Sequence, residues 1–227
     1  MRLTIPHYFE FGEDAAVLPS GLTSADAWDA LRTETGGAFA IPRDRGELER
    51  QADARPEIGE RARSLPIAGS LASYGAGVGL IELWLLRLHA GLQLTVTDYG
   101  PATVERLSGL LPEARVVQHN LRAGPLPADL HLFHRVDTEF SNRQWRSIFK
   151  AFRRERVVFV PGGLKTDEEM RTLLREMYRS LRYTRRLRGV QAGRVRTQAA
   201  MEALWSRSHR GTRTRFHDLA GWLLDPR

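Results

Sequence analysis

Three glycines stand at alternate positions in the stretch Gly75–Gly79, directly after a short apolar segment. Glycine lets the backbone come close to a ligand, and a helix that begins at such a turn directs its free N–H groups toward whatever binds there. A dinucleotide site has a further glycine at the position of Leu80, where it permits close helix packing around a pyrophosphate. The loop therefore favours a nucleoside over a nicotinamide dinucleotide, and a glycine-rich turn that holds no ligand is the alternative.

A carboxylate, Asp98, follows the loop about twenty residues later. It closes an apolar, β-branched segment and stands shortly before Pro101, where a helix could begin. A carboxylate at the carboxyl end of a parallel strand can accept hydrogen bonds from both hydroxyls of a ribose. The alternative is that Asp98 only serves the turn before Pro101, but the nearby glycine loop favours ribose binding.

Polar side chains crowd the stretch from His134 to Asn142, directly after another apolar segment. His134 is a candidate general base, with Asp137 or Glu139 orienting it or holding a substrate amine. The alternative is that the stretch caps a following helix, with Ser141 or Asn142 at the N-cap.

From residue 65 onward, short apolar runs alternate with helical patterns, as they do in βαβ units with a parallel sheet. The predicted strands are Ile67–Ser73, Leu92–Thr97, Arg115–Val117, Asp129–Phe133, Arg156–Val160, Leu181–Leu187 and Ala220–Leu224. The predicted helices are Val78–Ala90, Val104–Leu111, one that contains Trp145 and Phe152, Thr166–Tyr178 and Thr197–Arg207. We therefore expect an α/β, Rossmann-like three-layer sandwich with a mostly parallel sheet of about seven strands.

The first part of the chain lacks this alternation and has helix-compatible stretches at Ser24–Thr33 and Arg45–Arg63. We expect two parts, an N-terminal helical cap or lid at 1–64 and a ligand-binding core at 65–227. An aromatic cluster near the start is a candidate lid over an acceptor pocket, with an amphipathic packing segment as the alternative. The cluster consists of Tyr8, Phe9 and Phe11.

The chain is basic, with a net charge of +7 from 34 basic and 27 acidic residues. Clustered Lys and Arg would indicate a phosphate-binding face. Only Lys150 and Lys165 are lysines, however, and the arginines are spread along nearly the whole chain. A solvated arginine-rich surface is favoured, and a nucleic-acid face on the arginine-dense stretch Arg179–Arg196 is the alternative.

Several other classes of protein are disfavoured. The chain has no cysteine, which excludes disulfides, thiol catalysis and cysteine-ligated zinc. His209 and His217 lack metal-ligand spacing and His131 fits a structural role, so we expect no metal. No apolar run approaches the roughly 20 residues of a membrane span, and the first residues do not resemble a signal peptide. We expect a cytoplasmic protein without a membrane partner, and the sequence does not indicate its oligomeric state.

Together these motifs resemble the nucleoside-binding half of the class I S-adenosylmethionine-dependent methyltransferases. Leu71–Gly79 is similar to their first motif, Val96–Asp98 to the acidic end of their second strand, and Ala128–Phe133 to their fourth strand. Two positions depart from the family pattern. Ser73 stands where an acidic residue is usual, and Asn120 stands where aspartate is common.

The resemblance implies S-adenosylmethionine as the cofactor and methyl transfer to a small-molecule acceptor as the activity. An RNA methyltransferase and a catalytically silent cofactor-binding protein are the alternatives. The catalytic candidates are His134, Asp137 and Glu139. The implied cofactor-binding residues are Ser73, Tyr74, Gly75, Gly77, Gly79, Asp98, Tyr99, Asn120 and Leu121.

Overall fold

A computed structural model of the chain describes residues 2–7, 28–29, 32, 40–184 and 193–227. The lid candidates Tyr8, Phe9 and Phe11 and most of the predicted helix Ser24–Thr33 lie outside these residues. The strands are β1 (Thr4–His7), β2 (Leu71–Tyr74), β3 (Leu94–Asp98), β4 (Arg115–Gln118), β5 (Leu130–His134), β6 (Val157–Val160), β7 (Leu164–Lys165), β8 (Gly193–Thr197), β9 (His209–Phe216) and β10 (Leu219–Pro226). The helices are α2 (Arg45–Asp53), α3 (Pro56–Arg63), α4 (Leu80–Leu88), α5 (Pro101–Leu110), the 3₁₀ turn η1 (Leu121–Ala123), α6 (Asn142–Ala151), α7 (Asp167–Thr184) and α8 (Gln198–Trp205).

The main sheet has seven strands in the order β4-β3-β2-β5-β6-β10-β9. The strands from β4 to β6 are parallel, and β10 runs antiparallel to both of its neighbours. Tyr74, at the end of β2, lies between Thr97 of β3 and Phe133 of β5. The carboxyl ends of these strands therefore meet at one edge of the sheet, and the predicted mostly parallel seven-stranded sheet is confirmed.

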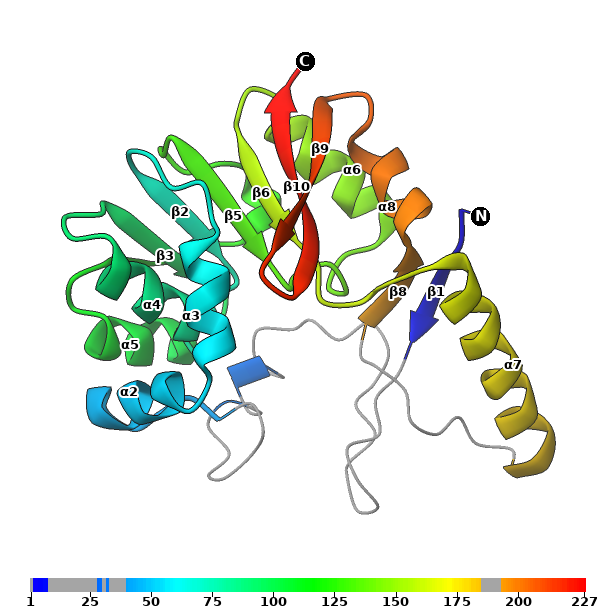
Figure 1. Ribbon diagram of the computed structural model, residues 1–227, viewed down its shortest axis with the longest axis horizontal. Coiled ribbons are helices and arrows are strands. Elements are labelled where there is room, and N and C mark those ends of the chain that lie inside the picture. Colours follow the sequence, from blue (N-terminus) through cyan, green and yellow to red (C-terminus); the bar gives the residue numbers. More distant parts are fainter. Residues whose placement is uncertain (1, 8–27, 30–31, 33–39, 185–192) are drawn as a thin grey trace.

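Helices cover both faces of this sheet (Figure 1). On one face α3, α4 and α5 bury the side chains of Leu71, Val96 and Leu132. On the other face α6 and α8 cover Tyr74 and Phe133, because successive residues of a strand point to opposite faces. The predicted three-layer sandwich is confirmed.

Two strand predictions differ from the structure. The predicted strand Leu181–Leu187 is wrong, because α7 continues to Thr184 and the rest of that range lies outside the described residues. β9 was not predicted, because its exposed positions carry arginine and threonine and not an apolar alternation. β9 is an edge strand whose partner is β10, and positive charge on an edge strand discourages pairing with another chain.

A second, three-stranded sheet has the order β1-β8-β7. β1 pairs antiparallel with β8, so that Thr4 lies opposite Arg196, and Figure 1 shows both strands beside α7. The first 64 residues are therefore not wholly helical, contrary to expectation. Their first strand joins a sheet formed by the C-terminal part, and the division of the chain at residue 64 stays a prediction.

Candidate functional site

The glycine loop between β2 and α4 has a backbone that favours glycine. Gly75, Gly77 and Gly79 have φ angles of 70°, 62° and 82°, in the left-handed region that other residues rarely adopt. A Cβ at residue 75 would lie 2.7 Å from Cγ1 of Val136, and one at residue 79 would lie 2.9 Å from Cδ2 of Leu107. At Gly77 the space is open except for the guanidinium of Arg32, 3.8 Å away. The loop thus needs Gly75 and Gly79 for packing, whereas Gly77 leaves an approach to the backbone.

Asp98 lies beside this loop with its carboxylate fully buried. Oδ1 accepts from the backbone N–H groups of Tyr99 and Gly100, at 2.8 and 3.2 Å. Oδ2 accepts from the N–H of Gly77 at 3.2 Å and forms an ion pair of 2.9 Å with Nη1 of Arg32. The carboxylate therefore fixes the position of the loop, and all four of its usual acceptor positions are in use.

Arg32 lies at the carboxyl edge of the sheet together with Trp28 and Asp29. Its Nη1 also donates to Thr103 Oγ1 at 3.0 Å, and its guanidinium lies 5.2 Å from the ring centroid of Trp28. Asp29 accepts from the N–H groups of Ala102 and Thr103, both at 3.1 Å, and so caps the first turn of α5. The role of Asp29 and Arg32 was not predicted, because no local pattern links them to residues 98–103.

Ser73 stands where the methyltransferase pattern has an acidic residue. The structure nevertheless places a carboxylate beside it, that of Glu82. Ser73 Oγ donates a hydrogen bond of 2.6 Å to Oε1 of Glu82, which lies in the first turn of α4. Both side chains are buried, Ser73 being 1% exposed and Glu82 0%. Burial, with a smaller contribution from the nearby charge of Asp98, raises the pKa of Glu82 to about 7, against the lowering effect of the Ser73 hydrogen bond.

Asp137 is buried between the loops that follow β5 and β6. Its two carboxylate oxygens accept from the N–H groups of Gly162 and Gly163, at 2.7 and 3.0 Å. Arg196 of β8 donates to its backbone carbonyl at 2.6 Å and to the side chain of Asn142 at 2.8 Å. Burial raises the pKa of Asp137, while the two backbone bonds and Arg196 lower it. The carboxylate therefore holds two loops in place.

Glu139 faces the N-terminal segment. Its Oε2 accepts from Nε1 of Trp28 at 3.3 Å. Burial raises the pKa of Glu139 to about 7, although the Trp28 hydrogen bond and the charge of Arg32 lower it. A carboxyl group with a pKa near neutral pH has the acid–base properties of a general base.

His134, in contrast to Glu139, has a lowered pKa. Burial, together with the positive charges of Arg135 and Arg61, lowers the pKa of His134 to about 3. Its Nε2 is buried and has no hydrogen-bond partner within the described part of the chain. The imidazole is therefore neutral at pH 7 and, with so low a pKa, a weak proton acceptor.

The remaining predicted residues divide between the site and the core. Burial and the charges of Glu139 and Asp98 raise the pKa of Tyr99, which belongs to the same group of side chains. Asn120 is exposed and caps η1 through a 3.0 Å bond from the N–H of Arg122, while Leu121 is buried.

Tyr74, a predicted cofactor-binding residue, has its side chain in the core. Its ring lies in the core on the face of α6, where its hydroxyl bonds to Nδ1 of His131 at 3.1 Å and accepts from the N–H of Leu126 at 2.9 Å. His131 thus has a structural role, as predicted.

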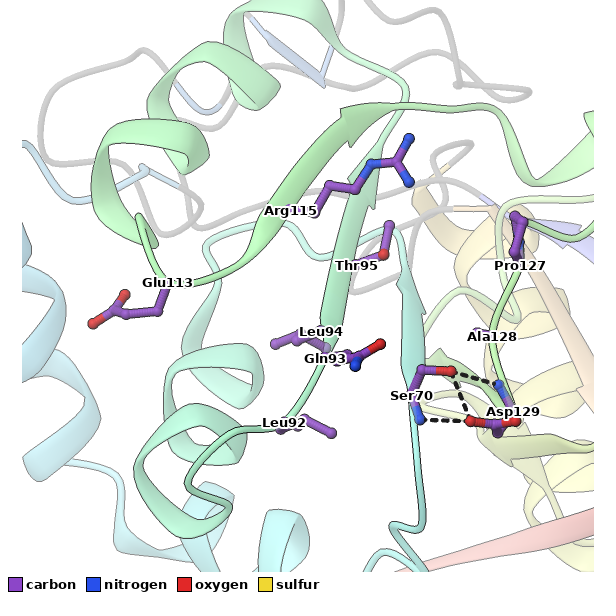
Figure 2. Close-up of a pocket in the computed structure, with 10 residues that line it drawn as sticks. All are labelled: Ser70, Leu92, Gln93, Leu94, Thr95, Glu113, Arg115, Pro127, Ala128 and Asp129. Atoms are coloured by element: carbon purple, nitrogen blue, oxygen red, sulfur yellow. Dashed lines mark hydrogen bonds between the residues drawn. The ribbon is translucent and has the colours of Figure 1, made fainter.

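A hollow of about 690 Å³ lies at the opposite edge of the sheet, where β2, β3, β4 and β5 begin. Figure 2 shows its lining, in which Asp129 accepts bonds from the N–H and hydroxyl of Ser70, at 2.7 and 2.8 Å. The hollow contains none of the predicted site residues. The hydrogen bonds of Asp129 join two strand ends. The predicted site residues therefore lie at the carboxyl edge of the sheet and not in this hollow.

Neither metal nor membrane features appear in the part of the chain that the structure describes. No group of three or more His, Asp or Glu side chains there could hold a metal ion. No described helix is long and apolar enough to cross a membrane.

Comparison with known proteins gives similarity of fold. No model of a known protein family matches the chain, and no curated protein sequence does. Human N-acetylserotonin methyltransferase, in complex with SAM, is similar in structure with a TM-score of 0.56 at 18% identity, over 91% of this chain and 64% of that one. The mitomycin 7-O-methyltransferase MmcR gives 0.59 at 16%, over 90% and 61%. An O-methyltransferase family 2 protein from Planctomyces limnophilus, in complex with apigenin, gives 0.57 at 11%, over 84% and 63%.

The chain thus has the Rossmann-like fold of these methyltransferases, and it spans less than two thirds of the length of each of the three. The sequence identities are too low to carry an activity from one chain to another. An activity for this chain must therefore be argued from the residues at its own site.

Proposed function

We propose that this protein is an S-adenosylmethionine-dependent methyltransferase that acts on a small-molecule acceptor. The observation that carries the proposal is the juxtaposition of the glycine loop with the buried carboxylate of Asp98 at the carboxyl edge of a parallel sheet. In open α/β sheets, ligands bind outside the carboxyl ends of the strands. The similar methyltransferases crystallised with SAM or with apigenin support the same assignment.

The residues at this edge fit an adenosyl cofactor. Gly77 leaves room for a nucleoside to approach the backbone. Asp98 can accept from a ribose hydroxyl where the ligand takes the place of Arg32. Tyr99, Asn120 and Leu121 follow β3 and β4 at the same edge, which suits contacts to the adenine. When bound, S-adenosylmethionine would supply a methyl group activated by its sulfonium. The chain itself must then hold the acceptor in line and manage its proton.

Glu139 is our candidate for the general base among the three catalytic candidates. Its pKa of about 7 leaves a large ionised fraction at neutral pH, ready to accept a proton from an acceptor O–H or N–H. Asp137 instead acts as a positioning residue for the loop that carries Glu139. His134 is less suited to proton transfer because its pKa is about 3.

Substitution of Gly77 tests the proposed cofactor site. We expect the wild type to bind S-adenosylhomocysteine in calorimetry with a Kd of about 1–10 μM, or roughly −7 to −8 kcal/mol. Gly77→Ala places a methyl group where the ligand would approach the loop, so affinity should fall at least about tenfold.

Gly91→Ala is the matched control for Gly77→Ala. Gly91 has a φ of 78°, and a Cβ there meets no heavy atom within 4 Å, so the two variants share the same backbone strain of roughly 1 kcal/mol. Binding to Gly91→Ala should match the wild type. Absence of wild-type binding at millimolar ligand, or equal binding to both variants, refutes the site.

The alternatives predict other results. A cofactor-binding protein without transferase activity would bind S-adenosylhomocysteine but release none from S-adenosylmethionine with any acceptor in a small-molecule panel. An RNA methyltransferase would bind transfer RNA with a constant that falls steeply with salt. Arg179 and Arg182 of α7 are exposed, as such a face requires, and the rest of that arginine stretch lies mostly outside the described residues. The absence of cysteine suits a reducing compartment, and the cytoplasm is the location we propose.

A further inference from the structure

Glu82 is a buried carboxyl group that the proposed function does not yet use. It lies in the first turn of α4 among apolar neighbours of the core, which include Leu80, Ile81 and Leu83. One carboxyl oxygen accepts from Ser73, and the other, Oε2, has no hydrogen-bond partner among the residues that the structure describes. Burying a carboxyl group without full compensation costs free energy, so its presence requires an explanation.

The surroundings of Glu82 are poor in positive charge. Asp98 is close enough that its charge raises the pKa of Glu82. Arg32 pairs with Asp98, and no ion pair to Glu82 is found in the described residues. The N-terminal end of α4 offers only its partial positive charge. Arg32 therefore balances the charge of Asp98 and leaves Glu82 without a cationic partner in the described residues, and a ligand with a positive charge would improve the balance.

The contact with Ser73 ties Glu82 to the glycine loop. Ser73 is two residues before Gly75, and Glu82 is three residues after Gly79, so the pair connects the strand and the helix that carry the two ends of the loop. Glu82 of α4 thus places a carboxylate next to Ser73, the position at which the resemblance predicts an acidic residue. Ser73 of the strand supplies a hydroxyl group, and Glu82 of the helix supplies a carboxyl group.

We propose that Glu82, acting through Ser73, provides the negative charge that holds the cationic amino-acid end of the adenosyl cofactor. The inference rests on the proposed function, and it names which end of the ligand this pair recognises. Glu82 is a positioning residue in this scheme, because it is fully buried and acts through the hydroxyl of Ser73. An adenosine ligand that lacks the amino-acid end should be indifferent to it.

The test compares two nucleosides by calorimetry. S-adenosylhomocysteine has the ammonium-bearing end, and 5′-methylthioadenosine has the same adenosine without it. Glu82→Gln keeps the shape of the side chain and removes its charge, so it should weaken S-adenosylhomocysteine about 10- to 100-fold, the usual range for a hydrogen bond to a charged group. The affinity for 5′-methylthioadenosine should stay within about twofold of the wild type.

A second change should restore binding. Ser73→Asp in the Glu82→Gln background moves the carboxylate from the helix to the strand, and it should recover most of the lost affinity for S-adenosylhomocysteine. Ser73→Ala alone leaves the carboxylate without its hydroxyl and should weaken the same ligand by a smaller factor. Thermal unfolding of each variant checks that it is folded, and Ser73→Ala serves if Glu82→Gln does not fold.

The outcomes separate the two proposals. Equal loss of both nucleosides in Glu82→Gln, or of neither, overturns the role of Glu82 while leaving the proposed function in place. Equal effects of Ser73→Ala on both ligands overturn it too. If the wild type binds neither nucleoside, the proposed function fails, and the role of Glu82 fails with it.

Discussion

The substitution Arg32→Met removes the ion pair between Arg32 and the buried carboxylate of Asp98. Arg32 contributes one of the four hydrogen bonds that the Asp98 carboxylate accepts, and a ribose must take its place to reach the same oxygens. Methionine keeps much of the apolar length of arginine and cannot pair with a carboxylate. Removing the pair should therefore weaken the protein alone but leave the cofactor complex nearly unchanged.

The size of the effect follows from the burial of the pair. The side chains are 10% and 0% exposed, so their hydrogen bond is of the charged, enclosed kind, worth about 1.5–3 kcal/mol. The free energy of unfolding should fall by that amount, because Asp98 keeps its three backbone N–H donors. In the variant, the ligand no longer has to break this ion pair to reach Asp98. S-adenosylhomocysteine should therefore bind about 10- to 100-fold more tightly.

Chemical denaturation and calorimetry measure the two halves of this prediction. Arg87→Met is a matched control, because Arg87 also pairs with an aspartate, Asp53 at 2.7 Å, and also lies 5.2 Å from a tryptophan ring, that of Trp84. Asp53 is mostly exposed, so the control should change stability and binding by less than about 1 kcal/mol. Weaker or unchanged binding in Arg32→Met refutes the reasoning, since Arg32 would then assist the ligand or lie apart from it.

Two further predictions concern pH. The pKa of Glu82 is about 7 in the folded protein and near 4.5 unfolded, so between these values the folded state binds more protons and the free energy of unfolding falls as pH rises, by about 3 kcal/mol in all. Denaturation at pH 4.5 and pH 8 should show a loss about 3 kcal/mol larger in the wild type than in Glu82→Gln, because Glu139, whose pKa is also about 7, contributes equally to both proteins. Parallel curves would contradict this. If Glu139 is the base, kcat/KM should rise with pH through about 7 and then level off. Glu139→Gln should lower the rate about 10²- to 10⁴-fold and remove the rise, and a variant that keeps the same pH profile would assign the base elsewhere.

The sequence was sufficient to predict the core of the fold, because its signals are local. Short apolar runs and the helices between them predicted the parallel strands from β2 to β6. Prediction failed where local residues are ambiguous. The apolar residues near Leu181 continue the spacing of α7, and the arginines and threonines of β9 lack the apolar alternation of a half-buried strand.

The site was predicted in part for the same reason. The glycine loop and Asp98 are local motifs next to predicted strands, and the structure brings them together. Arg32 and Glu82 were not predicted, because each becomes relevant only through a partner distant in sequence or on another element. The use of Asp137 to join two loops also depends on residues 25 and 26 positions away. Such pairings follow from the completed fold and not from any local pattern.

The strand order also has a consequence for the sequence of events in folding. β10 lies inside the sheet, between β6 and β9, although it comes after both in the chain. During synthesis one edge of β6 therefore keeps unpaired backbone N–H and C=O groups until residues 219–226 have left the ribosome. Such an edge is a template for association with other chains. Pairing of β10 with β6, and not formation of the glycine loop, is thus the step that covers this edge.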